Sequence, residues 1–373
     1  MDLGRLGTTF SCPARSQAVA CIVDATASRI WFTMVDKDPE HILGWAAIRF
    51  SGENLLSKIG SIRTPELMPA VEAFIKNAKR AIALCDVPVE MVSAGQWFQA
   101  AHTAASMEVF GLPQPPEAES NEHAALPAGE FERYRQRTRE LLSGRTTGNV
   151  YAWRTVNKFR RDRLLMTDVV HHVFLEFEGE EDRASEIYRT LMYSQLILSW
   201  TAFETLAGDL WEAALNVHPN TLASLFSKRP EQKDKDGNSR KSLPMSELER
   251  HRFDISRKMG TILRERVKFT TLDNITESYR SAFPPPARAN SEAFWDNTDL
   301  KSVSVIRNLL VHKGGIVDED FLDKRGADVR LATYKNGDML RMTGGDVQEM
   351  TLGLLEFSRS LIEDVDSWIA SNP

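Results

Sequence analysis

Hydrophobic and polar positions change their spacing along the chain, and this change predicts two kinds of structure. The first 50 residues contain three short apolar runs separated by polar turns: Ala18–Val23, Ile30–Val35 and Ile42–Phe50. Their β-branched and aromatic content predicts strands. Thr64, Pro65 and Glu66 then supply the cap, first-turn proline and first-turn acid of a helix that continues at helical spacing to Cys85. We therefore predict a small α/β domain over residues 1–112.

From Ser185 onward, apolar residues recur at the spacing of helices. The first predicted helix is long, and one side of it carries Ile187, Leu191, Leu198, Ala202, Leu206 and Leu210. Later helices are predicted over Leu248–Glu265, over Asp273–Ala282, and from Asp346 through Trp368. The segment LATYKNGDMLRMT, with its Asn336–Gly337 turn pair, predicts a hairpin. Residues 185–373 are thus expected to form a mainly α-helical bundle with a small β-hairpin, which makes the whole chain an α+β two-domain protein.

The amino-acid composition is that of a globular protein. The 373 residues are 42% hydrophobic and 26% charged, which is typical of a globular protein with two domains. Three widely spaced cysteines predict neither a disulfide framework nor a zinc site, so a reducing cytoplasm is expected. No apolar run is long enough for a membrane span. The sequence indicates no cofactor and no metal site.

Residues 113–184 read as a proline-containing linker followed by a basic helical connector. The net charge of the chain is −6, yet residues 130–165 are strongly basic. Tyrosine, tryptophan and phenylalanine are interleaved with the arginines, as in grooves that bind single-stranded RNA. The candidate RNA-binding residues here are Arg154, Lys158, Arg160, Arg161 and Arg163. The alternative is a solvated helix face that pairs with acidic surface elsewhere.

The stretch SVIRNLLVHKGGIV (Ser304–Val317) carries the strongest candidate chemistry. On a helical wheel, Arg307 and His312 lie at the two edges of one polar stripe, roughly 140° and about 7.5 Å apart along the axis. Asn308 lies one turn before His312. Gly314 and its neighbouring glycine are suited to end the helix, which would place His312 where the helix dipole favours an imidazolium. Such a pair suits a phosphodiester, because the histidine can move a proton while the arginine stabilises the oxyanion.

Glu204 is a carboxylate in the middle of the long apolar helix. Buried carboxylates need a partner, and Arg307 is the obvious one. Two roles are open for this pair: fixing the guanidinium for catalysis, or only stabilising the bundle. After the motif, Asp318–Asp320 could bind a cation, but are more typical of residues that cap a following turn.

At these residues the chain resembles the HEPN superfamily, in the branch that contains the prokaryotic RiboL-PSP and MAE-type proteins. The resemblance covers about residues 185–370 and is carried by four segments in the same order: SWTAFETLAGDLWEAALN (Ser199–Asn216), RVKFTTLDNITESYRSAF (Arg266–Phe283), the RNLLVH motif and HKGGIVDEDFLDK. Lys313, directly after the motif histidine, departs from the usual pattern. It could contact phosphate.

The resemblance implies a metal-independent endoribonuclease in which the ribose 2′-hydroxyl attacks the adjacent phosphate, leaving a cyclic phosphate. It also implies a homodimer whose two motifs face a shared cleft, with a role in antiviral defence or beside an antitoxin. Arg307 would stabilise the phosphorane, His312 would act as acid or base, and Asn308 would orient the phosphate or the ring. The alternative is a non-catalytic HEPN module that binds RNA, nucleotide or a protein partner.

Overall fold

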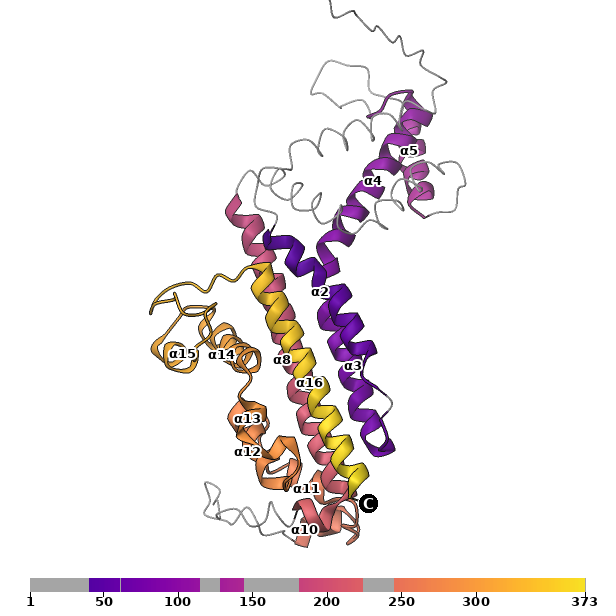
Figure 1. The fold of residues 1–373 in the computed structure, drawn as a ribbon. Coiled ribbons are helices and arrows are strands. Elements are labelled where there is room, and N and C mark those ends of the chain that lie inside the picture. Colours follow the sequence, from indigo (N-terminus) through magenta and orange to yellow (C-terminus); the bar gives the residue numbers. More distant parts are fainter. Residues whose placement is uncertain (1–39, 61, 115–127, 144–180, 224–244, 373) are drawn as a thin grey trace, which may run out of the picture. The chain divides into compact units, whose positions relative to one another are not determined.

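The computed structural model describes residues 40–60, 62–114, 128–143, 181–223 and 245–372 (Figure 1). The chain divides into two compact units. One contains residues 87–181, and the other combines residues 40–86 with residues 182–373. This grouping differs from the division at residue 112 that the sequence suggested, because the first described helices belong with the C-terminal part.

Every regular element in the described part is helical, so the chain is all-α there and the α+β prediction is wrong. The larger unit contains α2 (Glu40–Ser57), η2 (Pro65–Leu67), α3 (Met68–Ile82), η3 (Ala83–Asp86), α8 (Glu181–Val217), η5 (Pro219–Ala223), α10 (Met245–Arg250), α11 (Met259–Arg264), α12 (Leu272–Ala282), η6 (Arg288–Asn290), α13 (Glu292–Trp295), α14 (Thr298–Lys313), α15 (Glu319–Lys324) and α16 (Gly344–Ser371). The smaller unit contains α4 (Val87–Phe110) and α5 (Ala128–Leu142).

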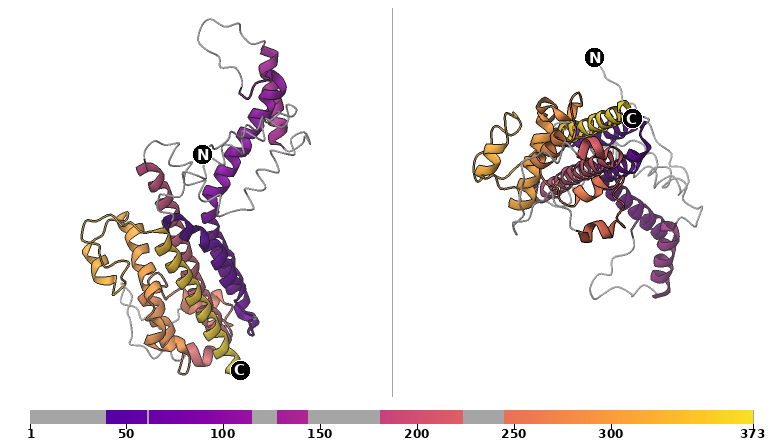
Figure 2. Two further views of the ribbon diagram at one scale, coloured as in Figure 1. Left: turned by 45° about the horizontal axis from the view of Figure 1, so that its top comes forward. Right: turned by 90° about the horizontal axis from the view of Figure 1, so that it is seen from below.

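The long helices α8 and α16 form the centre of the larger unit and run side by side in the same direction (Figures 1 and 2). Contacts join them along their length: Gln195 donates to Thr351 at 3.1 Å, and the rings of Phe203 and Phe357 lie 5.8 Å apart. The predicted long helix from Ser185 and the predicted final helix are confirmed. A capping box formed by Thr343 and Asp346 begins α16, so Thr343 is the N-cap and Asp346 completes the box.

Helix α2 packs along another face of α16, and α3 packs beside α2. Here the predicted strand Ile42–Phe50 is wrong. That segment lies within α2, and a stripe with four-residue spacing, Ile48, Gly52 and Leu56, explains why. Both apolar side chains are almost fully buried, and Gly52 lies close to Leu355 of α16. Burial of a helical stripe therefore outweighed strand propensity. The other two predicted strands, Ala18–Val23 and Ile30–Val35, lie outside the described residues.

The predicted hairpin between Leu331 and Thr343 is also wrong, although its turn is present. Gly337 adopts a φ of 88°, but the chain beyond it pairs with the segment that follows α14. A single antiparallel bridge joins Ile316 to Met339, and Val317 N donates to Asp338 O at 2.8 Å. A turn signal fixes the reversal locally, but the choice of partner depends on contacts distant in sequence.

The predicted helix Leu248–Glu265 is interrupted. Helix α10 ends at Arg250 and α11 begins at Met259, and between them three residues that are not glycine have positive φ. In contrast, the predicted helix Asp273–Ala282 is present as α12, which Thr271 caps through the backbone N–H of Asn274.

In its described residues, the smaller unit is a pair of packed helices. Its core consists of Ala101, Ala104, Ala105, Tyr134 and Leu141. Arg137 of α5 forms ion pairs with Glu108 of α4 and with Glu140. Tyr134, one of the aromatics interleaved with the arginines, is therefore unavailable for stacking on a base because the α4–α5 core buries it.

Candidate functional site

The motif helix α14 begins and ends with strong local signals. The Asn297 side chain accepts a hydrogen bond from Leu300 N at 2.9 Å, and Asp299 places an acid in the first turn. At the other end Gly314 adopts the left-handed conformation, with φ 61°. The predicted glycine-terminated helix with His312 in its last turn is confirmed.

Both ends of α14 are fixed to the rest of the larger unit. Near the N-terminal end, Ser302 donates to the buried carboxylate of Asp328 at 2.5 Å, while Arg330 donates to Asp328 at 2.7 Å and to Asp299 at 2.6 Å. Burial alone would raise the pKa of Asp328, but these hydrogen bonds outweigh it and the pKa is lowered.

At the C-terminal end, Leu340 N donates to Gly315 O at 2.8 Å, and the Tyr193 hydroxyl of α8 donates to Leu340 O at 2.8 Å. These hydrogen bonds connect the segment after the motif to α8, the helix that carries Glu204.

Arg307 is half-buried and held by two partners. Its Nη2 lies 3.8 Å from Glu204 Oε2 on α8, and its Nη1 donates to Asn308 Oδ1 at 2.9 Å. The ion pair with Glu204 is therefore present, as the sequence suggested, with both side chains about one-fifth exposed: 22% for Arg307 and 20% for Glu204. Arg307 Nε is buried without an acceptor among the described residues. The guanidinium is positioned by its neighbours, and only part of it can meet a ligand.

Asn308 has a role that the sequence did not indicate. Its side-chain oxygen accepts the hydrogen bond from Arg307, so it orients the guanidinium. In this arrangement Asn308 is a positioning residue.

His312 is exposed in the last turn of α14. The described contacts do not join it to Arg307, and the helical geometry turns the two side chains roughly 140° apart. The neighbouring Lys313 lies 3.3 Å from Asp318. Asp318 caps α15 by accepting from Phe321 N at 2.9 Å, as predicted for the acidic stretch. The Phe321 N–H, with help from Lys313, lowers the pKa of Asp318.

The basic candidates Arg154, Lys158, Arg160, Arg161 and Arg163 lie outside the described residues. Their proposed contact with RNA stays a prediction.

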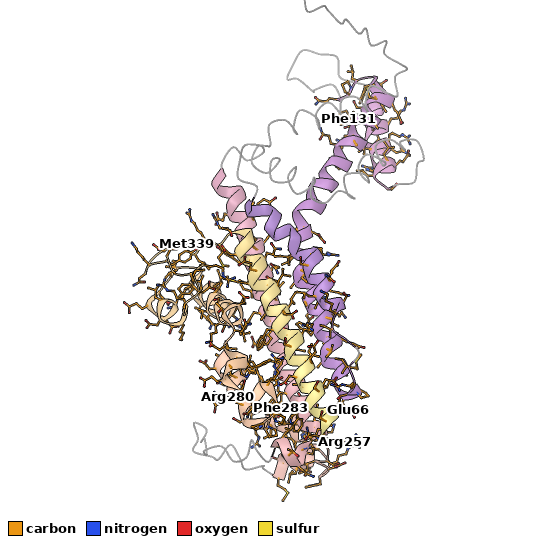
Figure 3. The ribbon with its side chains drawn as sticks, viewed as in Figure 1. Glu66, Phe131, Arg257, Arg280, Phe283 and Met339 are labelled. Atoms are coloured by element: carbon orange, nitrogen blue, oxygen red, sulfur yellow. The ribbon has the colours of Figure 1, made fainter. Side chains whose placement is uncertain are left out.

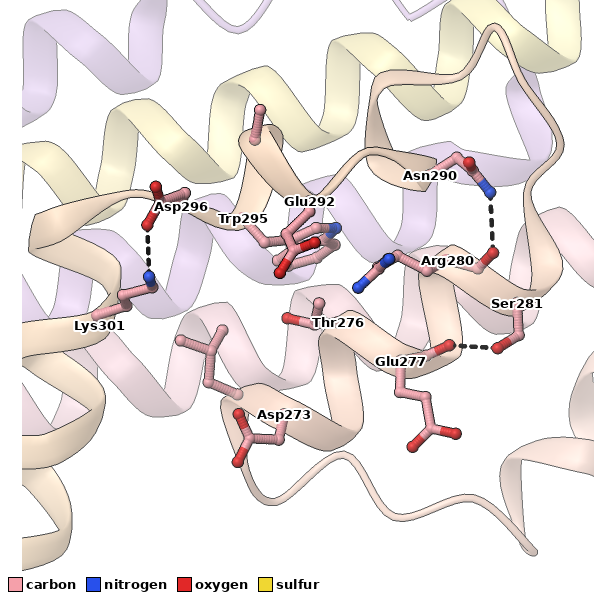
Figure 4. A pocket seen from close by; sticks show the side chains of 12 residues that line it. Asp273, Thr276, Glu277, Arg280, Ser281, Asn290, Glu292, Trp295, Asp296 and Lys301 are labelled. Carbon is pink, nitrogen blue, oxygen red and sulfur yellow. Dashed lines mark hydrogen bonds and ion pairs between the residues drawn. The ribbon is translucent and has the colours of Figure 1, made fainter. Parts of the chain in front are cut away.

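An open groove of about 1020 Å³ lies beside α12 and α13, and sequence reasoning did not anticipate it (Figure 4). Arg280 and Trp295 line its middle, while Lys301 at one end is paired with Asp296 at 2.5 Å. Four carboxylates line it: Asp273, Glu277, Glu292 and Asp296. This excess of acid disfavours a phosphodiester. In the part of the chain that the structure describes, no cluster of histidine, cysteine or carboxylate side chains is arranged to hold a metal ion.

Comparisons with protein families, with characterised proteins and with solved structures find no match to this chain. The HEPN resemblance therefore depends on the motif segments alone. Among the described helices, none is both long enough and apolar enough to span a membrane.

Proposed function

We propose that the protein is a metal-independent endoribonuclease of HEPN type that acts as a homodimer. One observation carries this proposal: α14 presents an exposed His312 beside its glycine end and, one and a half turns earlier, an Arg307 whose guanidinium Glu204 and Asn308 hold in place. The residue types supply a proton-transfer group and a fixed positive charge for a phosphorane.

A second copy of the chain would solve the geometric problem of the single helix. Because Arg307 and His312 point to different sides of α14, one copy offers each substrate phosphate only one of them at close range. Two copies related by a two-fold axis can bring the arginine of one to the histidine of the other. The doubled positive charge would also favour a polynucleotide.

The exposed face of α8 is a suitable surface for such a contact. Ile187 and Leu198 are 39% and 45% exposed, and Thr190, Ser194 and Thr201 lie between or beside them on the same side. The three hydroxyls donate to carbonyls four residues earlier at 2.7–2.9 Å, so this side presents few free polar groups. At three-residue spacing, Leu198 and Thr201 are followed on α8 by Glu204, which pairs with Arg307 of the motif helix. An uncharged helix face of this kind favours a protein contact over solvent.

In this proposal the 2′-hydroxyl of the substrate loses its proton to His312 or its counterpart and attacks the adjacent phosphorus. The bond to the 5′-oxygen breaks, and that oxygen takes a proton, leaving a cyclic phosphate and a 5′-hydroxyl. Arg307 would offset the charge on the phosphorane oxygens. A cytoplasmic setting and an antitoxin or defence partner belong to the same proposal.

One observation favours a second candidate, a non-catalytic HEPN module that binds RNA, nucleotide or a protein partner. Glu204 lies 3.8 Å from Arg307 Nη2 and partly offsets the positive charge, and Asn308 accepts one hydrogen bond from Nη1, so less of the guanidinium remains for a substrate phosphate.

The chemistry of the cleaved ends tests the first proposal. The purified protein is incubated with total RNA in EDTA, and the fragments are then labelled with a polynucleotide kinase without prior phosphatase treatment. Direct labelling is expected, because attack by the 2′-hydroxyl leaves free 5′-hydroxyl ends. Fragments that label only after phosphatase treatment would contradict it. RNA binding without any cleavage would favour the non-catalytic module.

A further inference from the structure

The connection between α10 and α11 departs most strongly from what its sequence predicts. Residues 248–265 contain no proline, and their one glycine, Gly260, lies within α11. Their apolar spacing predicts one helix. The helix instead breaks, and Arg252, Phe253 and Arg257 adopt φ values of 55°, 60° and 55°. Side chains that are not glycine, asparagine or aspartate rarely occupy this region. Strain that local sequence does not demand is concentrated at functional positions.

The same loop, residues 251–258, exposes an aromatic ring. Phe253 is 64% exposed, more than any other large aromatic side chain in the described part of the chain. Its backbone is fixed even though its ring is free, because Phe253 N donates to Leu248 O at 2.8 Å and Asp254 N donates to His251 O at 3.1 Å. The ring is therefore presented to solvent on a held backbone.

The loop that carries this ring is also rich in cations. Arg252, Arg257 and Lys258 are all exposed, and no ion pair within the described residues engages them. The carboxylate of Asp254, the single acid of the loop, accepts hydrogen bonds from the backbone and hydroxyl of Ser256. The loop is thus locally positive in a chain whose net charge is −6.

We propose that this loop is a second contact site for single-stranded RNA, at which Phe253 stacks on a base and Arg252, Arg257 and Lys258 contact the flanking phosphates. The proposal rests on the proposed function for the class of ligand. An exposed aromatic ring on a loop that also carries three exposed cations matches a base flanked by phosphates. A protein partner would instead favour a ring of apolar neighbours that excludes water, and the exposed neighbours of Phe253 in the loop are charged or polar.

The loop lies far from the motif within the larger unit. Arg257 and Met339, which bridges to the glycine end of α14, are at opposite ends of this unit (Figure 3). The loop therefore increases affinity for a long strand without taking part in bond cleavage. Its loss should raise KM for long RNA and leave kcat unchanged.

Binding is measured by fluorescence anisotropy with a labelled oligouridylate of about 20 nucleotides, longer than one typical single-strand site. Its riboses carry 2′-O-methyl groups, so the 2′-oxygen cannot attack and binding is observed without cleavage. Phe253→Leu is expected to weaken binding at least about fivefold, whereas Phe253→Tyr, which keeps the ring, stays near wild type. Arg257→Gln is expected to lower the slope of log affinity against log salt by about 0.7.

Two controls separate a contact from a folding defect. Arg80→Gln removes a matched exposed cation on α3 and should leave affinity unchanged. Phe253→Gly relieves the positive φ, so its unfolding midpoint should equal or exceed that of the wild type while binding is still weakened. The proposal is overturned if Phe253→Leu binds RNA with wild-type affinity. It is also overturned if every variant that loses affinity has a lower unfolding midpoint.

The outcome is separable from that of the nuclease proposal. If the wild type cleaves RNA and the loop variants bind normally, this inference fails and the nuclease stands. If no form cleaves but Phe253→Leu loses binding, the nuclease fails and the RNA contact stands. Absence of binding by the wild type overturns the loop proposal.

Discussion

Glu204 Oε2 lies 3.8 Å from Arg307 Nη2 and joins the central helix α8 to the motif helix α14. The two residues are far apart in the sequence, and each is about one-fifth exposed. An ion pair of this kind contributes little to stability because solvent screens it. Its effect is geometric: together with Asn308, it fixes the direction of the guanidinium.

Replacing Glu204 with glutamine should therefore affect catalysis more than stability. We expect cleavage to fall about 10- to 100-fold because the guanidinium loses its alignment, while the free energy of unfolding changes by less than about 1 kcal/mol. Single-turnover cleavage and urea unfolding measure the two effects. Glu349→Gln, which weakens the exposed ion pair with Arg330, is the matched control. Equal effects of both substitutions on cleavage would remove Glu204 from the site.

Two buried aspartates should make the larger unit sensitive to acid. Burial raises the pKa of Asp366 in α16, but hydrogen bonds from Arg63 and Thr64 outweigh it, and Asp328 behaves in the same way. Both folded-state pKa values lie below the ordinary 3.8, so the stability they give is complete above about pH 4 and is lost as pH falls through those values.

Urea unfolding at neutral pH and below pH 4 measures this loss. Asp366→Ala should cost about 1–3 kcal/mol at neutral pH, because Arg63 N and Thr64 N lose their acceptor. It should also flatten the dependence on acid. The exposed Glu363→Gln provides the control. An equally steep acid dependence in Asp366→Ala would contradict the assignment.

The glycine that ends α14 has a purely conformational requirement. A Cβ at Gly314 would meet nothing within 4 Å, yet its φ is 61°. Gly314→Ala should therefore cost about 1 kcal/mol of unfolding free energy through backbone strain alone. Gly345→Ala, at a position without positive φ, should cost much less. Thermal unfolding compares the two, and similar losses would show that the left-handed end is unimportant.

The uncharged face of α8 predicts a specific way to break a dimer. Leu198→Glu places a carboxylate in the proposed contact, and we expect it to weaken dimerisation at least about tenfold. Light scattering over a range of protein concentrations measures this. Met245→Glu alters a residue that is 69% exposed on α10 and should have no effect. A Leu198→Glu protein that stays dimeric, or a wild type that is monomeric, would exclude this face as the subunit contact.

Sequence patterns predicted helices better than they predicted pairing between distant segments. Apolar spacing located α8, α12 and α16, and Gly314 located the end of α14, because these signals are local. The helical spacing of Ile48, Gly52 and Leu56 is difficult to recognise in the sequence, because β-branched and aromatic neighbours favour a strand. Burial of this stripe against α16 explains why the segment is a helix. Likewise, Asn336–Gly337 predicts a turn but does not indicate that the chain beyond it pairs with Val317.

The candidate site was predictable where one residue was chemically out of place. Glu204 stands alone among apolar neighbours, which pointed to Arg307 as its partner. The hydrogen bond from Arg307 to Asn308 and the network of Ser302, Asp328 and Arg330 had no such signal. Their partners lie on loops or on adjacent positions of a helix, where spacing carries no information about contact.

The most direct test of the proposed nuclease is cleavage of single-stranded RNA in EDTA by the wild type, Arg307→Ala and His312→Ala. We expect the wild type to cleave, each substitution to lower the rate at least about 100-fold, and Arg80→Ala to cleave as the wild type does. Cleavage that survives both substitutions would contradict the proposal.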